Sequence, residues 1–277
     1  MKPIEKIVNI HGHLRVEHDV DAMVEHWHKL NVVKHIMLGL EGNFKTLGYK
    51  GNGDILHWMK KYPDFIVGMG FMNLSKNKDP VSKIEYLRGQ GFSGLKFIQP
   101  AYNYGDECYF GYYEKAQELG MPILFHTGWV APAVLEGLAE HDIDSERMRP
   151  YQLDRITREF PNLKIIGAHL GWPHHNEALT LMQGAKNLYY DITGGGGGKA
   201  HMASVRGAFT PFYEKGAEKQ ELMDKIFDKL VFGTDNPPVE VWLANSESLM
   251  EEFNVSPESR EYFYWRNAAR IFGWDNL

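Results

Sequence analysis

Eight short apolar runs recur along the chain, and this alternation constrains the fold more than any other feature of the sequence. The runs are residues 7–13, 32–40, 65–73, 94–100, 122–128, 163–171, 188–194 and 230–238. Amphipathic stretches separate them, a pattern typical of parallel strands that are joined and covered by crossover helices. We therefore expect a parallel sheet with helices packed against it.

Turn signals end the helical segments that precede several of these strands. KKYPD stands before the third run, RGQGFSG before the fourth, QELGMP before the fifth and REFPNL before the sixth. Together with a final amphipathic stretch, EYFYWRNAARIFGW, this alternation predicts a closed α/β fold, the (β/α)8 or TIM barrel of metal-dependent hydrolases. No linker composition divides the chain, so residues 1–277 are expected to form a single domain. An open doubly wound sheet is the alternative.

Composition narrows the classes of function. The chain has 277 residues, of which 43% are hydrophobic, enough for one large core. With 30 Lys and Arg against 36 Asp and Glu, nothing electrostatic favours a nucleic acid or an anionic membrane as partner. We find no run of secretory or membrane-spanning length and expect a cytoplasmic protein. Cys108 is the only cysteine, so any metal would be held by His and carboxylate groups.

The chemical signal is the position of the polar residues. His11 and His13 stand two residues apart on the first strand, so the side-chain period of two points them to the same face. His126, His169 and Asp235 come near the ends of the fifth, sixth and eighth strands. Because the strand ends of a barrel converge at one mouth, where active sites of this fold are built, we expect these five side chains to meet there.

Imidazole and carboxylate ligands without thiolate suit Zn²⁺, with Mn²⁺ and Fe²⁺ as alternatives. Such a cation acidifies a bound water and makes it a usable nucleophile at neutral pH. Asp235 has a second potential task, because a carboxylate beside that water can take its proton. Five other histidines are expected on helices and are interpreted as surface or core residues: His18, His26, His28, His57 and His141.

The glycine run from Gly194 to Gly198, followed by Lys199, superficially looks like a phosphate-binding loop. The Walker pattern would require Gly in place of Thr193 and Ser or Thr in place of Ala200, so two required positions fail. Successive glycines lower the cost of backbone rearrangement. We interpret the run as a mobile loop after the seventh strand.

The ordered set of segments around these residues resembles a known superfamily. The segments are NIHGHL, GFSGLKFIQP, MPILFHTG, NLKIIGAHLGWP, LYYDITG, LVFGTDNPP and RNAARIFGW, and they run from residue 9 to residue 274. The chain resembles the amidohydrolase superfamily, most closely its amidohydrolase-related branch, which includes aminocarboxymuconate-semialdehyde decarboxylase and related lactonases. The H-x-H pair alone is a weak signal, whereas the ordered set is a strong one.

The resemblance implies a role for each matching position. His11, His13, His126 and Asp235 would bind the metal, and one ion is expected rather than two. His169 matches a histidine that polarises the substrate in single-metal members and binds the second ion in two-metal members. Lys96 stands where some two-metal relatives carry a carbamylated bridging lysine. We favour an unmodified Lys96 that is solvated or orients the substrate.

Other positions bear on the substrate. Trp129, Trp172 and Tyr102, with His174, His175 and Tyr104, follow strand ends and either wall a pocket for a flat substrate or pack loops onto the rim. Arg15 and Arg206 are the only candidates for an arginine that holds a substrate carboxylate, and each is also interpretable as a surface charge. Asn9 departs from the aspartate of many relatives, although an amide can still orient the neighbouring imidazole.

Three hypotheses for the function follow. The first is a metal-dependent hydrolase that uses metal-activated water to cleave a C–O or C–N bond in a small molecule, of the lactone or amide type. In it, Asp235 carries the proton and His169 stabilises the oxyanion. The second is a non-oxidative decarboxylase of an aromatic or enol-type acid. The third is a metal-binding protein without catalysis. The expected partner is a small-molecule substrate, and a homodimer is an alternative to the monomer.

Overall fold

Every expected strand is present in the computed structural model, which describes residues 4–130, 143–214, 219–236, 238–275 and 277. The strands are β1 (Ile7–His13), β2 (Val32–Leu38), β3 (Ile66–Asn73), β4 (Gly94–Ile98), β5 (Ile123–Phe125), β6 (Ile165–Gly167), β7 (Leu188–Asp191) and β8 (Leu230–Val231). All neighbouring strands pair in parallel, in the order of the chain. Consecutive parallel pairing requires a crossover connection after each strand.

The last strand lies against the first. The Ile10 amide donates to the Phe232 carbonyl at 2.9 Å, and the His13 amide donates to the Asp235 carbonyl at 3.0 Å. A parallel bridge also joins Gly12 to Asp235. An open sheet would leave these groups at separate edges, so the expectation of a (β/α)8 barrel is confirmed and the doubly wound alternative is wrong.

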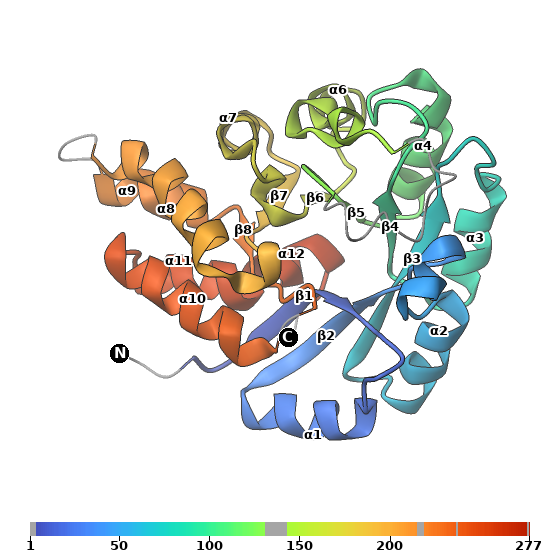
Figure 1. Ribbon diagram of the computed structural model, residues 1–277, viewed down its shortest axis with the longest axis horizontal. Coiled ribbons are helices and arrows are strands. Elements are labelled where there is room, and N and C mark those ends of the chain that lie inside the picture. The colour runs from blue at the N-terminus through green and yellow to red at the C-terminus, as the bar shows by residue number, and fades with distance from the viewer. Residues whose placement is uncertain (1–3, 131–142, 215–218, 237, 276) are drawn as a thin grey trace.

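Helices surround the strands, as Figure 1 shows. The α-helices are α1 (Val20–Lys29), α2 (Asn52–Lys61), α3 (Ser82–Gly89), α4 (Phe110–Glu118), α6 (Asp154–Glu159), α7 (His175–Gly184), α8 (Lys199–Tyr213), α9 (Lys219–Phe227), α10 (Val239–Glu252), α11 (Pro257–Glu261) and α12 (Asn267–Phe272). Short 3₁₀ turns occupy Gly42–Leu47, Glu107–Tyr109, Ser145–Met148, Pro150–Leu153, His169–Gly171 and Gly195–Gly197, and a π-helical turn covers Tyr262–Arg266. No described helix is long and apolar enough to cross a membrane.

Two layers of apolar side chains hold the barrel together. Alternate strand residues, such as Ile36 and Leu38, pack inside the strand ring, and the other residues, such as Met37, pack against the helices. Both layers exclude water almost completely, because Ile36, Met37 and Leu38 are each at most 1% exposed. The polar residues at the mouth therefore lie above a closely packed core that excludes water.

A β-bulge in β1 sets the direction of the two histidines. Val8 and Ile10 belong to the inner layer, and the register against β2 shifts between Asn9 and Gly12. The extra residue reverses the alternation, so Gly12 faces outward. A side chain at Gly12 would meet the ring of His35 at 2.4 Å. His11 and His13, on either side of Gly12, therefore share the inner face with Ile10.

Several strands end earlier than their apolar runs. The structure ends β5 at residue 125, β6 at 167 and β8 at 231, so His126, His169 and Asp235 lie just beyond the strands. His169 and Asp235 have φ angles of 63° and 55°, in the left-handed region that strands do not use. Such backbone is costly for a residue with a side chain and is concentrated at functional sites.

Candidate active site

Three side chains from the first and last strands form one of two potential metal-binding groups among the described residues. His11, His13 and Asp235 bring one ligand atom each to within 4.8 Å of one another. The Nε2 atoms of the two histidines are 3.2 Å apart, and Asp235 Oδ1 lies 3.5 Å from that of His11 and 3.6 Å from that of His13. The group lies at the mouth of the barrel, as the sequence predicts.

Hydrogen bonds determine which nitrogen of each imidazole carries the proton. His11 Nδ1 donates to Asp191 Oδ2 at 2.8 Å, because an ionised carboxylate only accepts. His13 Nδ1 donates to the Leu38 carbonyl at 3.4 Å. In the neutral rings both Nε2 atoms therefore carry lone pairs. In these tautomers two lone pairs and a carboxylate oxygen face one another, and a cation between them would relieve their repulsion.

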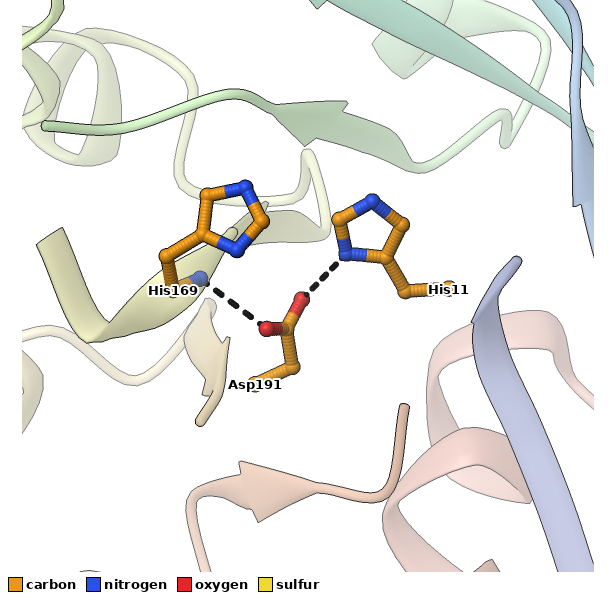
Figure 2. Close-up of side chains that lie close together, drawn as sticks. All are labelled: His11, His169 and Asp191. Carbon is orange, nitrogen blue, oxygen red and sulfur yellow. Dashed lines mark hydrogen bonds and ion pairs between the residues drawn. The ribbon is translucent and has the colours of Figure 1, made fainter. Parts of the chain in front are cut away.

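The second potential metal-binding group consists of His11, His169 and Asp191. Figure 2 shows the Asp191 carboxylate between the two imidazoles, bound to His11 through its ring and to His169 through its main chain. Asp191 accepts from His11 Nδ1, from the His169 amide and from the amide and hydroxyl of Thr193. We interpret Asp191 as the residue that orients a ligand, because its oxygens are engaged and His11 turns its protonated nitrogen toward it.

Thr193 extends this network to His169. Its hydroxyl donates to Asp191 Oδ1 at 2.5 Å and accepts from His169 Nδ1 at 2.9 Å. The proton of neutral His169 is thus on Nδ1, and its Nε2 carries a lone pair. Gly194 has a φ of 115°, and a side chain there would lie 3.2 Å from His169 Nδ1. The first glycine of the run therefore makes room for His169.

The opposite side of the mouth holds two polar groups without partners. His126 Nε2 and Lys96 Nζ are buried and have no hydrogen-bond partner among the described residues. The His126 ring centroid lies 4.9 Å from that of His169, and the His169 centroid lies 5.3 Å from that of His11. His126 and His169 are therefore close to the group of His11, His13 and Asp235. All five expected ligands gather in one place.

Burial controls the electrostatics of the site. Desolvation lowers the pKa of His13 and His126 well below the ordinary value, and neighbouring imidazoles lower it further. Desolvation also lowers the pKa of His169 to about 4 and that of Lys96 to about 8. Burial raises the pKa of Asp191, but attraction to His11 outweighs it and the net pKa is lowered. The site thus combines neutral imidazoles with an ionised carboxylate beneath them.

These residues fit a divalent cation. Ligand atoms about 2.0–2.1 Å from a tetrahedral ion lie roughly 3.3 Å from one another. The observed separations among His11, His13 and Asp235 are 3.2 to 3.6 Å. His126 Nε2 is buried and has no hydrogen-bond partner in the described structure. The donor set and the unsatisfied nitrogen both accord with a metal site.

The predicted substrate residues lie at different depths. Trp129 and Tyr102 are exposed, at 43% and 54%, and Trp129 packs edge-on against Trp172 with ring centroids 5.2 Å apart. Tyr104 is fully buried and donates to the carbonyls of Phe97 and His126. Tyr104 therefore supports the mouth from beneath and is not part of a pocket wall.

Both arginine candidates already have acidic partners. Arg15 donates to Glu17 Oε1 at 2.6 Å and stacks over the ring of Tyr49. Arg206 donates to Glu252 at 2.8 Å and to Ser248 at 2.9 Å. The exposed partners of Arg206 accord with the interpretation as a surface charge, whereas Arg15 also covers the half-buried Tyr49.

The remaining histidines lie mostly where the sequence places them. His26 and His28 lie in α1 and His57 in α2, whereas His18 lies just before α1. His141 is outside the described residues. His174 is half-buried beside Trp172, and His175 is buried and donates from Nδ1 to the Leu170 carbonyl. Cys108 is exposed, and burial raises the pKa of its thiol to about 11, which accords with no nucleophilic role.

Asp191, Thr193 and Tyr49 are site residues that sequence reasoning misses. Asp191 and Thr193 belong to the segment LYYDITG. The acidic residue at the end of this strand was the sequence signal that could have identified them. Tyr49 lies far from any strand end, yet its ring centroid is 5.5 Å from that of His13. Nothing in the sequence around Tyr49 marks this contact, because it depends on how the loop after β2 folds back.

Comparison with solved structures supports the fold. The chain is similar to a probable 2-pyrone-4,6-dicarboxylic acid hydrolase from Acinetobacter baumannii, with 14% identity, coverage of 97% of this chain and 100% of that chain, and a TM-score of 0.64. It is similar to 2,6-dihydroxybenzoate decarboxylase from Rhizobium, with 15% identity, 99% and 100% coverage, and a TM-score of 0.62. It is also similar to 5-carboxyvanillate decarboxylase from Sphingomonas paucimobilis, with 13% identity, 94% and 84% coverage, and a TM-score of 0.61.

A family model assigns the chain more closely. At the identities above, the solved structures show a shared fold only, and the comparison with curated proteins gives no match. Residues 43–274 match the model of the family described as Amidohydrolase. The match covers most of the 277 residues of the chain. The resemblance seen in the sequence is thus confirmed, and the chain belongs to the amidohydrolase family of enzymes.

Proposed function

We propose that this enzyme is a metal-dependent hydrolase that cleaves a C–O or C–N bond of a small molecule, of the lactone or amide type. One observation carries the proposal: the lone pairs of His11 and His13 and a carboxylate oxygen of Asp235 face one another within 3.6 Å. With both imidazoles neutral and protonated on Nδ1, that arrangement is repulsive by itself and suits a cation. A divalent cation held there would acidify a water and polarise a substrate carbonyl.

Asp235 is suited to move the proton in this reaction. Its Oδ1 faces the two imidazoles, and its side chain is 20% exposed, more than that of either histidine. Asp235 takes a proton from the attacking water and delivers it to the departing oxygen or nitrogen, so that the water is split across the cleaved bond.

His169 contributes a lone pair, because its Nδ1 proton is held by Thr193. A neutral imidazole of this tautomer cannot donate from Nε2. We therefore propose His169 as a ligand or proton acceptor in place of the oxyanion donor expected from the sequence. Together with His126 and the group of His11, His13 and Asp235, it could hold one ion. Zn²⁺ suits these ligands best, with Mn²⁺ and Fe²⁺ as alternatives.

A decarboxylase is the second candidate, and Lys96 is the specific observation in its favour. Its buried ammonium group lacks a partner among the described residues and could hold the carboxylate of an acidic substrate. Two of the similar structures are decarboxylases and one is a probable 2-pyrone-4,6-dicarboxylic acid hydrolase. The hydrolase is placed first because Asp235 and the ligand group supply what hydrolysis requires.

The test combines metal analysis with turnover. We expect about one divalent ion per chain after reconstitution, and turnover of members of a lactone and amide panel. His11→Ala is expected to remove the ion and to lower turnover by more than the roughly 10- to 100-fold loss typical of a residue that only orients a ligand. His57→Ala, which replaces an exposed histidine on α2, is the matched control and should retain both.

Two results would count against the proposal. A folded protein that binds no divalent ion after full reconstitution contradicts the metal site. Release of CO₂ from aromatic acids, with no turnover of lactones or amides, assigns the chain to the decarboxylase alternative.

A further inference from the structure

A cavity of about 210 Å³ lies where the strands β2, β3 and β4 end. One molecule of liquid water occupies about 30 Å³, so the cavity has room for a substituent of several non-hydrogen atoms. None of the residues His11, His13 and Asp235 lines this cavity. The residues that line it include Glu41, Phe71, Asn73, Asp79, Ile98 and Gln99.

The apolar part of the lining adjoins Lys96. Gly70 of β3 faces the helices, because a side chain there would meet Leu87 of α3 at 2.7 Å. Phe71, the next residue, therefore faces the barrel interior, since side chains alternate along a strand. Phe71 pairs in register with Lys96 of β4, and Ile98, two residues after Lys96, shares its face. The cavity thus continues the barrel mouth on the side of Lys96.

Gln99, the residue after β4, combines an unsatisfied polar group with an unfavourable backbone. Its Nε2 is the only polar side-chain atom of the described lining residues that is buried without a hydrogen-bond partner. A buried N–H group costs free energy until something accepts from it. The φ angle of Gln99 is 55°, in the left-handed region that is unfavourable for a residue with a side chain. Such backbone is concentrated at functional sites, so both observations point to Gln99.

The acidic residues of the lining already have partners. Glu41 accepts from the Asn52 amide at 3.1 Å and from Lys83 Nζ at 3.3 Å. Asp79 accepts from the Asn73 amide at 2.7 Å and from Lys83 Nζ at 2.9 Å. Two carboxylates in the same cavity favour the N–H end of a side-chain amide over its C=O end. The unsatisfied group of the lining is therefore a hydrogen-bond donor.

We propose that Gln99 is a specificity-determining residue that donates an N–H group to an oxygen of the substrate, away from the bond that is cleaved. The inference rests on the proposed function, since the reacting carbonyl would lie at the metal ligands and the rest of the substrate would extend past Lys96 into this cavity. Among lactones and amides, Gln99 favours those with a further oxygen substituent over those with an apolar group of the same size.

Two lactones serve as probes, γ-acetyl-γ-butyrolactone and γ-isopropyl-γ-butyrolactone. Their substituents have the same branching and the same number of non-hydrogen atoms, and only the acetyl group has an oxygen. The kcat/KM of each is measured with the zinc-loaded full-length protein. Their binding is measured by ligand-observed NMR after chelation of the metal, so that turnover does not interfere. We expect the acetyl compound to be favoured about tenfold in both measurements, because one hydrogen bond to a buried donor has an effect of this size.

Substitutions at Gln99 test the donor. Gln99→Glu keeps the size of the side chain and replaces the donor by a charged acceptor, so the preference for the acetyl compound should vanish. Gln99→Gly removes the amide and suits the left-handed backbone, so the preference should vanish without loss of stability against denaturant. Gln90→Glu makes the first change at an exposed position after α3, outside the cavity lining, and should leave the preference unchanged.

The outcomes separate this proposal from the proposed function. Equal values for the two lactones in the wild type, absence of binding by both, or a preference that survives in both Gln99 variants overturns the role of Gln99. A fall of kcat/KM by the same factor for both lactones in Gln99→Gly also overturns it, because the side chain would then only support the loop. Failure of the proposed function would abolish metal binding and hydrolysis, but a binding preference that depends on Gln99 would remain in the chelated protein.

Discussion

The polar groups on the two sides of the barrel mouth differ in whether they have hydrogen-bond partners. On the side of β1, β6, β7 and β8, His11, His169, Asp191 and Thr193 form a closed network in which every proton has an acceptor. On the side of β4 and β5, buried atoms of Lys96 and His126 have no partner in the described structure. The first side is therefore hydrogen-bonded within the protein, whereas the second offers buried polar atoms that a metal or substrate could satisfy.

This difference separates two kinds of site residue. The network holds the imidazoles in the tautomer and direction that the proposed cation would require, as residues around metal ligands commonly do. The unpartnered groups leave buried polar atoms unsatisfied, at a cost of about 1–3 kcal/mol each. Stability lost at such positions commonly marks a place where binding or chemistry needs the group.

The largest effect is expected from a substitution at Asp191, in the hydrogen-bonded network. In Asp191→Asn the carboxylate that accepts the His11 proton loses its charge, and the new amide N–H groups oppose the donors of His169 and Thr193. We expect metal affinity to fall about 10- to 100-fold. The dissociation constant is measured by competition with a chelator.

Asp228→Asn is the matched control for this change, because Asp228 is half-buried and accepts from Ser259 at 2.8 Å, with no part in the site. It should leave metal affinity unchanged. An Asp191→Asn protein with wild-type metal affinity would show that Asp191 does not orient His11.

A smaller effect is expected from substitution of Lys96, on the side with the unpartnered groups. Stability should rise and turnover should fall. Lys96→Met removes a buried ammonium group and should raise the free energy of unfolding of the metal-free protein by about 1–3 kcal/mol. Turnover should fall about tenfold, because the group that faces the substrate is gone. Denaturant unfolding and steady-state kinetics measure the two changes.

The number of ions decides the state of Lys96. With an unmodified lysine, both wild type and Lys96→Met bind one ion per chain. Two ions in the wild type and one in the variant would establish the carbamylated bridge and exclude the unmodified residue.

The smallest effect is expected at the rim, which belongs to neither side. Tyr102 is 54% exposed, so Tyr102→Ala should change the free energy of unfolding by no more than about 0.5 kcal/mol. If Tyr102 walls the pocket, KM should rise a few-fold, by roughly 1 kcal/mol or less, while kcat stays constant. An unchanged KM assigns Tyr102 to loop packing, the alternative given by the sequence.

Pattern and spacing were sufficient for the strands and for most of the candidate ligands. The eight apolar runs correspond to β1–β8, and the two-residue spacing of His11 and His13 places them together. Spacing alone predicted that the two histidines share a face but did not predict the β-bulge. The bulge turns both histidines to the inner face beside Ile10. A bulge depends on pairing with β2 and is invisible in β1 alone.

Proton positions and partners could not be predicted in this way. The tautomer of His169 depends on Thr193, which is 24 residues away, and that of His11 on Asp191, which is 180 residues away. These contacts exist only after the barrel closes. For this reason we propose His169 as a ligand or proton acceptor, whereas the sequence alone led us to expect an oxyanion donor.

The sequence by itself determined the barrel and the residue types available for a metal, because periodic burial and strand-end positions are local properties of the chain. Only the folded chain shows which nitrogen of His11 meets Asp191, and where the cavity lined by Gln99 lies. The physical reason is that hydrogen bonding and desolvation act over a few ångströms in space, between groups that may be separated by most of the chain.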